Sequence, residues 1–434
     1  MLSDDNHVVR ACADLDVDLT VVYGPAQKDF GLSELPADPP PVFVEDSVSV
    51  ESVLLGLYRA GIDPSGFDAV YSTHEDGVVV AAALAKVFGV RSIAPPEVAA
   101  LFRDKSLAKA KLHAAGIDAA RFVVIEDLCD LPDDFELPFS PAVLKPVAGG
   151  ATWHASIIRS RADLRAAVER VRQKRSDRAY ILEEFVSGQE WLANGVVFGG
   201  ELQFLCVSSY HKSCLTTLSE KEWLRTFVFD PVEDAEVYER VTPFVENALR
   251  TLGLRDGVFH MEVFDDTEGD RLVFGECAAR RGGVFVEEEI AYKFGVSLAE
   301  AAVQCALGER PVIKPEVRPG HVGTVYLPYT PGVLVARPSA EELVALPDVQ
   351  WAMVEWPVGL PMFQARSTIM KIGQAMVTAD SREELFRRGD EVVTWFADRT
   401  LVAPFDSTAR DLREWYANAP AGGTERHSVW AAHP

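Results

Sequence analysis

Two acidic residues and one arginine are spaced so that neighbouring β-strands could bring them together to bind a metal ion and a phosphate group. Glu262 lies in the apolar run 258–264, and Glu276 lies in a second run, 271–277. Because side chains alternate along a strand, antiparallel pairing of these runs places both carboxylates on one face. Paired carboxylates need a cation, and hard oxygen ligands suit Mg²⁺. Arg280 follows Glu276 on the same face of the second strand, where its guanidinium can contact phosphate oxygens.

An ordinary hairpin with solvent-facing charges would also explain an isolated pair of glutamates. The apolar neighbours and the Gly282-Gly283 turn, which leads into a helix N-terminus, favour a binding site instead. His260 shares a strand face with Glu262, and two roles stay open for it. It would contact substrate or act as a base, or it would be a hydrogen-bonded structural residue.

Two lysines upstream are candidates for phosphate binding. Lys145 ends a buried-looking strand and is followed by Gly149 and Gly150, where backbone amides can approach phosphate without a Cβ in the way. Lys105 stands at the start of a helical stretch. A solvated side chain is the plain explanation for either lysine alone. Their order before the two acids favours a nucleotide site.

The helices and strands that must position these residues belong to several predicted domains. Short β-type runs alternate with helical stretches over the first hundred residues, which predicts a parallel α/β domain without a G-x-G-x-x-G turn. Two β runs meet at Gly199-Gly200, a hairpin signal, whereas residues 210–229 are polar and are expected to be irregular. A Pro-rich stretch, 311–319, marks a boundary. We expect five ranges: an α/β domain at 1–103, a lid with its linking helix at 104–186, a catalytic subdomain at 187–310, an α+β subdomain at 311–408 and a tail at 409–434.

Composition excludes some classes of protein. The 434 residues carry a net charge of −24, with 48% hydrophobic and 25% charged residues. A folded chain is expected, and nucleic acid is not expected as a partner because its binding needs clustered Lys and Arg. The six cysteines show no zinc-like spacing, and the longest apolar stretch, near 78–84, is too short to span a membrane. We therefore expect a cytoplasmic protein without a membrane partner, and a homodimer stays open.

Six motifs in a fixed order resemble those of the ATP-grasp superfamily, most closely the bacterial L-amino-acid ligases, along nearly the whole chain. Any one of these motifs is weak, but the ordered set is specific. The motifs are Phe102-Arg103-Asp104-Lys105, Ala142-Val143-Leu144-Lys145-Pro146, Gly149-Gly150, Leu182-Glu183-Glu184-Phe185-Val186, Val258-Phe259-His260-Met261-Glu262 and Gly275-Glu276-Cys277-Ala278-Ala279-Arg280.

This resemblance implies an α/β and α+β multidomain ATP-grasp fold, with an N-terminal parallel α/β domain and a C-terminal α+β subdomain. It implies ATP with Mg²⁺ or Mn²⁺ as cofactors, Lys105 and Lys145 on the ATP phosphates, and a loop at 148–152 that closes over them. Glu190 would bind the ribose, Glu262 and Glu276 the metal, and Arg280 would stabilise the transferring phosphate. Four residues would form the hinge whose backbone reads adenine: Glu183, Glu184, Phe185 and Val186.

The implied reaction joins a small carboxylic acid, expected to be an amino acid, to an amine through an acyl phosphate. Water must be excluded from such an intermediate, and the lid at 122–180 is the expected closing element. The segment 210–225 is either a loop over the substrate or an ordinary surface loop. An Asn usual in the family is replaced by Ala278, and Trp153 and His154 follow a glycine-poor phosphate loop. A carboxylase, a small-molecule kinase and a non-catalytic nucleotide-binding protein are the alternatives.

Overall fold

The computed structural model describes residues 5–25, 40–132, 134–150, 152–174, 179–220, 222–266, 268–283, 285–328, 330–363 and 370–417. The chain forms two compact units. The first draws on residues 1–150, 154–207 and 234–317, and the second on residues 151–153, 208–233 and 318–434.

The first unit begins with a small parallel α/β region. Strand β1 pairs parallel with β2, and a further parallel bridge joins Ala69 to Arg91. Helices α3 and α4 pack their apolar side chains, among them Leu57 and Leu84, against these strands. The predicted parallel α/β arrangement is therefore present. The elements are α1 (Asn6–Asp14), β1 (Val22–Tyr23), β2 (Val42–Phe43), α3 (Val50–Arg59), η1 (Pro64–Gly66), η2 (Glu75–Gly77), α4 (Val78–Phe88) and α5 (Pro96–Leu101).

A linking helix and a four-stranded antiparallel sheet come next. Helix α6 begins directly after Asp104, whose carboxylate accepts hydrogen bonds from the amides of Ser106 and Leu107. The sheet has the order β3-β6-β4-β5, and its apolar face shares a core with α7 through residues such as Leu144 and Leu164. The elements are α6 (Lys105–Ala114), β3 (Phe122–Ile125), η3 (Leu128–Asp130), β4 (Ala142–Pro146), β5 (Ser156–Ile158), α7 (Arg161–Lys174) and β6 (Tyr180–Glu184).

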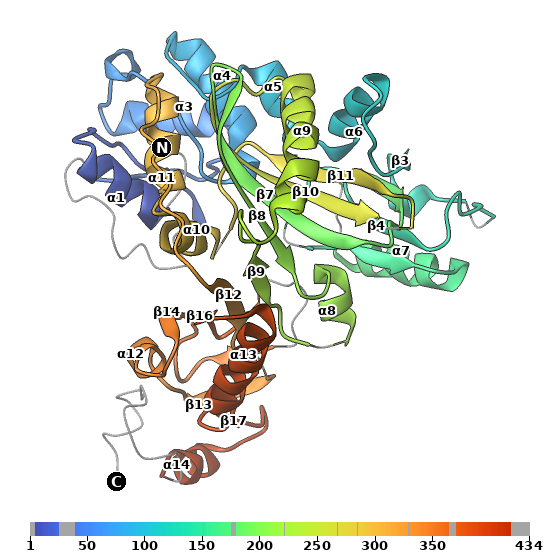
Figure 1. Cartoon of the computed structure of the whole chain (residues 1–434), viewed down its shortest axis with the longest axis vertical. Coiled ribbons are helices and arrows are strands. Elements are labelled where there is room, and N and C mark those ends of the chain that lie inside the picture. The colour runs from blue at the N-terminus through green and yellow to red at the C-terminus, as the bar shows by residue number, and fades with distance from the viewer. Residues whose placement is uncertain are drawn as a thin grey trace. The chain divides into compact units, whose positions relative to one another are not determined.

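A second antiparallel sheet carries the two acidic strands. Its strand order within the first unit is β11-β10-β7-β8. The hairpin between β7 and β8 turns at Gly199 and Gly200, which adopt φ values of 65° and 79° that favour glycine. Helix α11 packs on β7 and β10, and α1 packs on α11 (Figure 1). The elements are β7 (Gln189–Phe198), β8 (Glu201–Tyr210), α9 (Ala235–Leu252), β10 (Gly257–Asp266), β11 (Arg271–Ala278), α10 (Val286–Phe294) and α11 (Leu298–Leu307).

The second unit is an α+β fold. The end of β8, from Ser208, pairs with β9, and two three-stranded sheets follow in the orders β12-β16-β14 and β15-β13-β17. Helix α13 packs against β12 and β16. The elements are α8 (Cys214–Glu220), β9 (Thr226–Val228), β12 (His321–Tyr326), β13 (Gly332–Ala336), α12 (Ala340–Val344), β14 (Val349–Val354), β15 (Pro361–Met362), β16 (Gly373–Ala379), α13 (Arg382–Ala397), β17 (Leu401–Ala403) and α14 (Ala409–Ala417).

The expectation of an irregular segment at 210–229 is wrong. This stretch contains α8 and β9, because Phe227 is buried and packs edge-on against Phe386 of α13. Within the second unit, the ring of His211 also contacts that of Phe386 in a tilted arrangement, and Arg225 pairs with Asp390 at 2.5 Å. These contacts give the segment a structural role, and a role over the substrate stays a prediction.

Two other expectations about the chain's organisation differ from the structure. Residues 409–417 of the expected tail form α14, whereas the rest of that tail, 418–434, lies outside the described residues. Residues 208–233, expected in the catalytic subdomain, cluster with the second unit. The five domain ranges otherwise stay a prediction.

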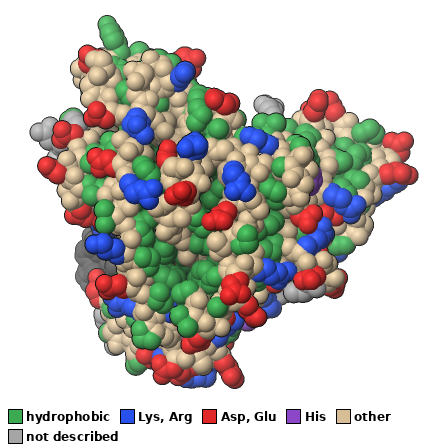
Figure 2. All heavy atoms as spheres, turned by 45° about the horizontal axis from the view of Figure 1, so that its top comes forward, with side chains coloured by type: hydrophobic (Ala, Val, Ile, Leu, Met, Phe, Trp, Pro, Cys, Tyr) green, Lys and Arg blue, Asp and Glu red, His purple; other side chains and the backbone are tan. Residues whose placement is uncertain are grey.

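The surface mixes both signs of charge. Figure 2 shows Asp and Glu side chains interspersed with Lys and Arg over the face in view. All six cysteines are free thiols. Among the helices of the described ranges, none combines the length and apolar character needed to cross a membrane.

Candidate active site

The two predicted metal ligands face each other across one β-hairpin. Strands β10 and β11 pair antiparallel, with Glu262 opposite Glu276 and His260 opposite Ala278. A register irregularity follows immediately after Glu262. Burial raises the pKa of the Glu262 carboxyl well above its usual range, and the negative charge of Glu276 raises it further. The hairpin thus brings two carboxyl groups together, and ionisation of Glu262 is disfavoured there.

Two lysines from different elements meet at Glu276. Lys105 is the first residue of α6, and Lys145 lies near the end of β4. Their Nζ atoms lie 3.1 Å and 3.6 Å from Glu276 Oε2. Burial raises the pKa of Glu276, but the two lysines lower it more strongly, to about 2. Glu276 is therefore ionised at neutral pH, and two ammonium groups compensate its charge.

The predicted phosphate loop begins beside Lys105. Its Nζ donates a hydrogen bond to the carbonyl oxygen of Gly149 at 2.6 Å. A Cβ on Gly150 would lie 3.8 Å from Glu75 Oε2, so the glycine pair also borders this carboxylate. Ala151, inside the predicted loop, lies outside the described residues. The Lys105 ammonium therefore contacts both the predicted phosphate loop, at Gly149, and the carboxylate of Glu276.

Arg280 is held by a carboxylate from the N-terminal α/β region. Its Nη2 donates to Glu75 Oε2 at 2.7 Å. The other oxygen of Glu75 lies 3.6 Å from Arg103 Nη1 and 4.0 Å from Lys105 Nζ. Arg103 also pairs with Asp76. A single largely buried carboxylate is thus shared by three cations that belong to two predicted motifs.

The glycine turn after Arg280 packs closely on His260. A Cβ on Gly282 would come within 2.7 Å of Asn194 Oδ1 and 2.9 Å of His260 Nδ1, so only glycine fits here. His260 Nδ1 lies 2.8 Å from Asn194 Oδ1 and donates to it. Burial lowers the pKa of His260 to about 4, so the ring is neutral at pH 7. These contacts support the structural role for His260, and its contact with substrate stays a prediction.

A second lysine on α6, Lys109, is fully buried behind the site. Its Nζ donates to the carbonyl oxygens of Phe274 and Gly275 at 3.2 Å and 2.6 Å, directly before Glu276 on β11. It also lies 3.5 Å from Glu183 Oε1, whose other oxygen lies 3.2 Å from Lys145 Nζ. Lys109 therefore connects β11 to the strand that leads into the predicted hinge.

The two buried lysines respond differently to the same carboxylate. Burial lowers the pKa of Lys109 to about 8, because Glu183 offsets only part of the cost. Burial also lowers the pKa of Lys145, but Glu183 and Glu276 together raise it above the ordinary value. Both lysines are consequently charged at pH 7, and Lys145 holds its proton more tightly.

The predicted hinge follows β6. The Glu183 side chain points to the lysines, whereas the Glu184 carboxylate accepts hydrogen bonds from the backbone and side chain of Arg121, the latter at 2.7 Å. The amide of Phe185 donates to Pro141 O at 3.2 Å. The hinge is thereby anchored to segments on both sides, and adenine binding by the backbone of 183–186 stays a prediction.

The facing carboxylates fit a hard divalent cation. Glu262 and Glu276 would supply oxygen ligands, and the charge of Glu190, buried on β7, acts on Glu262. A cation there would relieve the repulsion that raises the pKa of Glu262. Among the described residues, no group of three or more His, Cys, Asp or Glu side chains is arranged as a complete metal site.

Sequence reasoning missed Glu75 and Lys109. Lys109 lies four residues after Lys105, which places both on one side of α6, and this spacing was an available signal. Glu75 lies in a short helical turn far away in the sequence, and nothing in its neighbourhood marks it. Only the tertiary fold brings it to Arg280.

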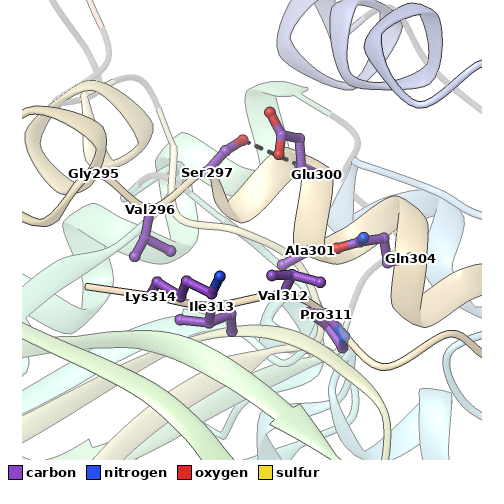
Figure 3. A pocket seen from close by; sticks show the side chains of 10 residues that line it. All are labelled: Gly295, Val296, Ser297, Glu300, Ala301, Gln304, Pro311, Val312, Ile313 and Lys314. Carbon is purple, nitrogen blue, oxygen red and sulfur yellow. Dashed lines mark hydrogen bonds between the residues drawn. The ribbon is translucent and has the colours of Figure 1, made fainter. Parts of the chain in front are cut away.

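Two of the pockets lined by described residues lie in the first unit. One is small and is bordered by Glu75, Lys105 and Glu276 of the candidate site. The other, shown in Figure 3, lies where α11 begins, against residues 311–314. The amide of Glu300 there donates to Ser297 Oγ at 3.1 Å, so the helix start is already capped. None of the predicted site residues lines this second pocket.

Comparisons with known proteins show similarity in sequence and in fold. A family model described as ATP-grasp domain matches residues 138–288. The L-arginine-specific L-amino acid ligase of Bacillus subtilis is 25% identical over 306 residues, which cover 69% of this chain and 72% of that protein.

Two solved structures share the arrangement over most of their length. The L-amino acid ligase from Bacillus licheniformis has a TM-score of 0.72 and 19% identity, covering 93% of this chain and 97% of that one. The carboxyaminoimidazole ribonucleotide synthase from Aspergillus clavatus, complexed with ATP, has a TM-score of 0.67 and 16% identity, covering 90% and 96%. The likeness extends well beyond the segment that the family model matches.

Proposed function

We propose that this chain is an ATP-dependent carboxylate-amine ligase, because residues 138–288 match a family model described as ATP-grasp domain and the fold resembles that of a solved L-amino acid ligase. It joins a small carboxylic acid, itself an amino acid, to an amine and releases ADP and phosphate. Similarity to an L-arginine-specific L-amino acid ligase supports amino acids as the substrate class. The observation that carries the proposal is the meeting of Lys105 and Lys145 at Glu276, which lies opposite Glu262. Arg280 joins this cluster through Glu75, which also lies near Lys105.

The nucleotide lies between the hinge and the lysines in this proposal. Lys105 and Lys145 turn from Glu276 to the ATP phosphates, which satisfy the same charges. The backbone of 183–186 reads adenine, and Glu190 binds the ribose. Glu262 and Glu276 hold Mg²⁺, or Mn²⁺ in its place, which neutralises charge on the triphosphate when bound. Free thiols throughout fit a reducing compartment, so we place the reaction in the cytoplasm.

The reaction proceeds in two steps. A carboxylate is a poor electrophile, so an oxygen of the acid first attacks the γ-phosphorus of ATP and ADP leaves. The amine nitrogen then attacks the acyl carbon, the C–O bond to phosphate breaks, and the protons lost by the nitrogen leave with phosphate and to solvent. In this proposal, the guanidinium of Arg280 stabilises charge on the transferring group. The sheet at 122–180 closes over the acyl phosphate and excludes water.

A screen of paired amino acids tests the proposal. Phosphate release from ATP with Mg²⁺ is measured for each pair, and products are identified by mass spectrometry. An amide together with ADP is expected. Incorporation of carbon dioxide would identify a carboxylase, a phosphorylated acid without amide would identify a kinase, and no phosphate release with any pair would favour a non-catalytic nucleotide-binding protein.

A matched pair of variants tests the site. Glu276→Gln keeps the shape of the side chain but removes the charge that Lys105 and Lys145 share, so turnover should fall by about a hundredfold or more. Glu268→Gln changes an exposed residue in the turn of the same hairpin and should stay near wild type. Circular dichroism should be unchanged in both. Near-normal turnover of Glu276→Gln would remove Glu276 from the site.

A further inference from the structure

Glu75 contacts two cations that the proposed function assigns to the phosphate groups of ATP, Arg280 and Lys105. Its carboxylate accepts a hydrogen bond from Arg280 at 2.7 Å and lies within 4.0 Å of Lys105. Gly150 of the predicted phosphate loop borders the same oxygen. Glu75 therefore lies among the groups assigned to the transferred phosphate, although it belongs to the N-terminal α/β region.

When phosphate binds to these cations, each carboxylate of the cluster loses the cation with which it is now paired. Lys105 and Arg280 are each paired with a protein carboxylate here, Glu276 and Glu75. When these cations turn to phosphate, each carboxylate is left largely buried, and a buried charge without a partner is costly. Glu276 regains a cation with the metal ion. Among the described residues, the cation that Glu75 keeps is Arg103 at 3.6 Å, which is already paired with Asp76.

We propose that the missing cation is the ammonium group of the amine substrate, bound by Glu75. This inference rests on the proposed function and narrows its substrate class. The acceptor is an amine that carries positive charge on its nucleophilic nitrogen before reaction, as an α-amino acid does. Glu75 thus holds Arg280 in the absence of nucleotide and holds the incoming amine when phosphate has taken Arg280.

The charge arrangement also orders the binding events. An ammonium arriving before ATP would compete with Arg280 for Glu75, and Arg280 is already bonded at 2.7 Å. Once phosphate has engaged Arg280, the carboxylate is available. The amine therefore binds after ATP, at a point beside the phosphate loop where an acyl phosphate would lie.

Steady-state kinetics of Glu75→Gln test this assignment with two kinds of nucleophile. The common L-amino acids carry an ammonium group, whereas hydroxylamine is uncharged at neutral pH and traps an acyl phosphate as a hydroxamate. Gln keeps the size of the side chain and an oxygen for Arg280 but loses the charge. We expect the KM for the amino-acid nucleophile to rise more than tenfold, while hydroxamate formation falls less than threefold.

The KM for ATP separates this role from a structural one. Because Glu75 competes with phosphate for Arg280, Glu75→Gln should lower the KM for ATP or leave it unchanged. Glu45→Gln is the matched control, since Glu45 is an exposed glutamate of the same N-terminal α/β region; its KM for the amino acid should stay within twofold of wild type. An unchanged KM for the amino acid in Glu75→Gln, or an equal loss with both nucleophiles and with ATP, would overturn the inference. Absence of hydroxamate and ADP in the wild-type protein would instead refute the proposed function.

Discussion

Replacing Lys109 with methionine should destabilise the first unit far more than a surface lysine would. Lys109 is fully buried, donates to the carbonyl oxygens of Phe274 and Gly275, and pairs with Glu183 at 3.5 Å. Methionine has a similar length and fills the same space, so packing is retained and only the charge and its hydrogen bonds are lost. The variant therefore isolates the polar role of this side chain.

The magnitude follows from the partners that would be left behind. Removing one member of a buried ion pair costs about 3–5 kcal/mol when the remaining charge is uncompensated. Here Lys145 still compensates Glu183 at 3.2 Å, which reduces that part, but two buried carbonyl oxygens lose a donor at about 1–3 kcal/mol each. We expect a loss of about 3–5 kcal/mol in the free energy of unfolding, a large fraction of the roughly 5–15 kcal/mol typical of proteins.

Urea unfolding followed by tryptophan fluorescence and circular dichroism measures this loss. With a slope of about 1–3 kcal/mol per molar urea, the midpoint should fall by at least about 1 M. Lys111→Met is the control, because Lys111 lies on the same helix but is exposed, and it should change stability by less than about 0.5 kcal/mol. If Lys109→Met lowered the urea midpoint no more than Lys111→Met, the contacts of the buried Lys109 ammonium would not stabilise the fold.

Local patterns predicted the elements of the site well. The register that sets Glu262 opposite Glu276 follows from alternating apolar residues, because a slip of one residue would expose every buried side chain. The start of α6 follows from Asp104, an N-cap residue, and the β7–β8 turn follows from Gly199 and Gly200. Each of these features depends on a few neighbouring residues, so the sequence alone determines it.

Features set by distant contacts could not be predicted. Residues 210–229 read as polar and irregular, but Phe227 packs on Phe386, more than one hundred and fifty positions later, and this burial permits α8 and β9. Likewise, Glu75 gains its importance only when the fold brings it to Arg280, 205 positions away in the sequence. Local propensity carries no information about such partners.

Three cations of the site are paired with protein carboxylates. The motifs that contain these cations therefore do not include every residue that positions them. Lys105 is paired with Glu276, and Lys145 with Glu183. Arg280 is paired with Glu75. A cation held by a carboxylate is already oriented, so less side-chain entropy is lost when phosphate replaces the carboxylate. The motif lysines and arginine therefore depend on acids that lie partly outside the motifs.

Two further variants test the support of Arg280 and of the N-terminal helix. The hydrogen bond to Glu288, at 3.1 Å, raises the pKa of His7 against the opposing effect of burial. The stabilisation by this ion pair is present below about pH 6.5 and is lost as pH rises through the raised pKa of His7. The urea midpoints of wild type and His7→Asn should therefore differ at pH 5.5 and converge by pH 8.5. A difference that does not change with pH would contradict this reasoning. Gly282→Ala places a Cβ within 2.6 Å of Val286 Cγ2 and should lower both the free energy of unfolding, by about 1–3 kcal/mol, and turnover, because the turn after Arg280 must shift. Gly283→Ala meets open space and should do neither, and equal effects of the two alanines would show that close packing at this turn does not position Arg280.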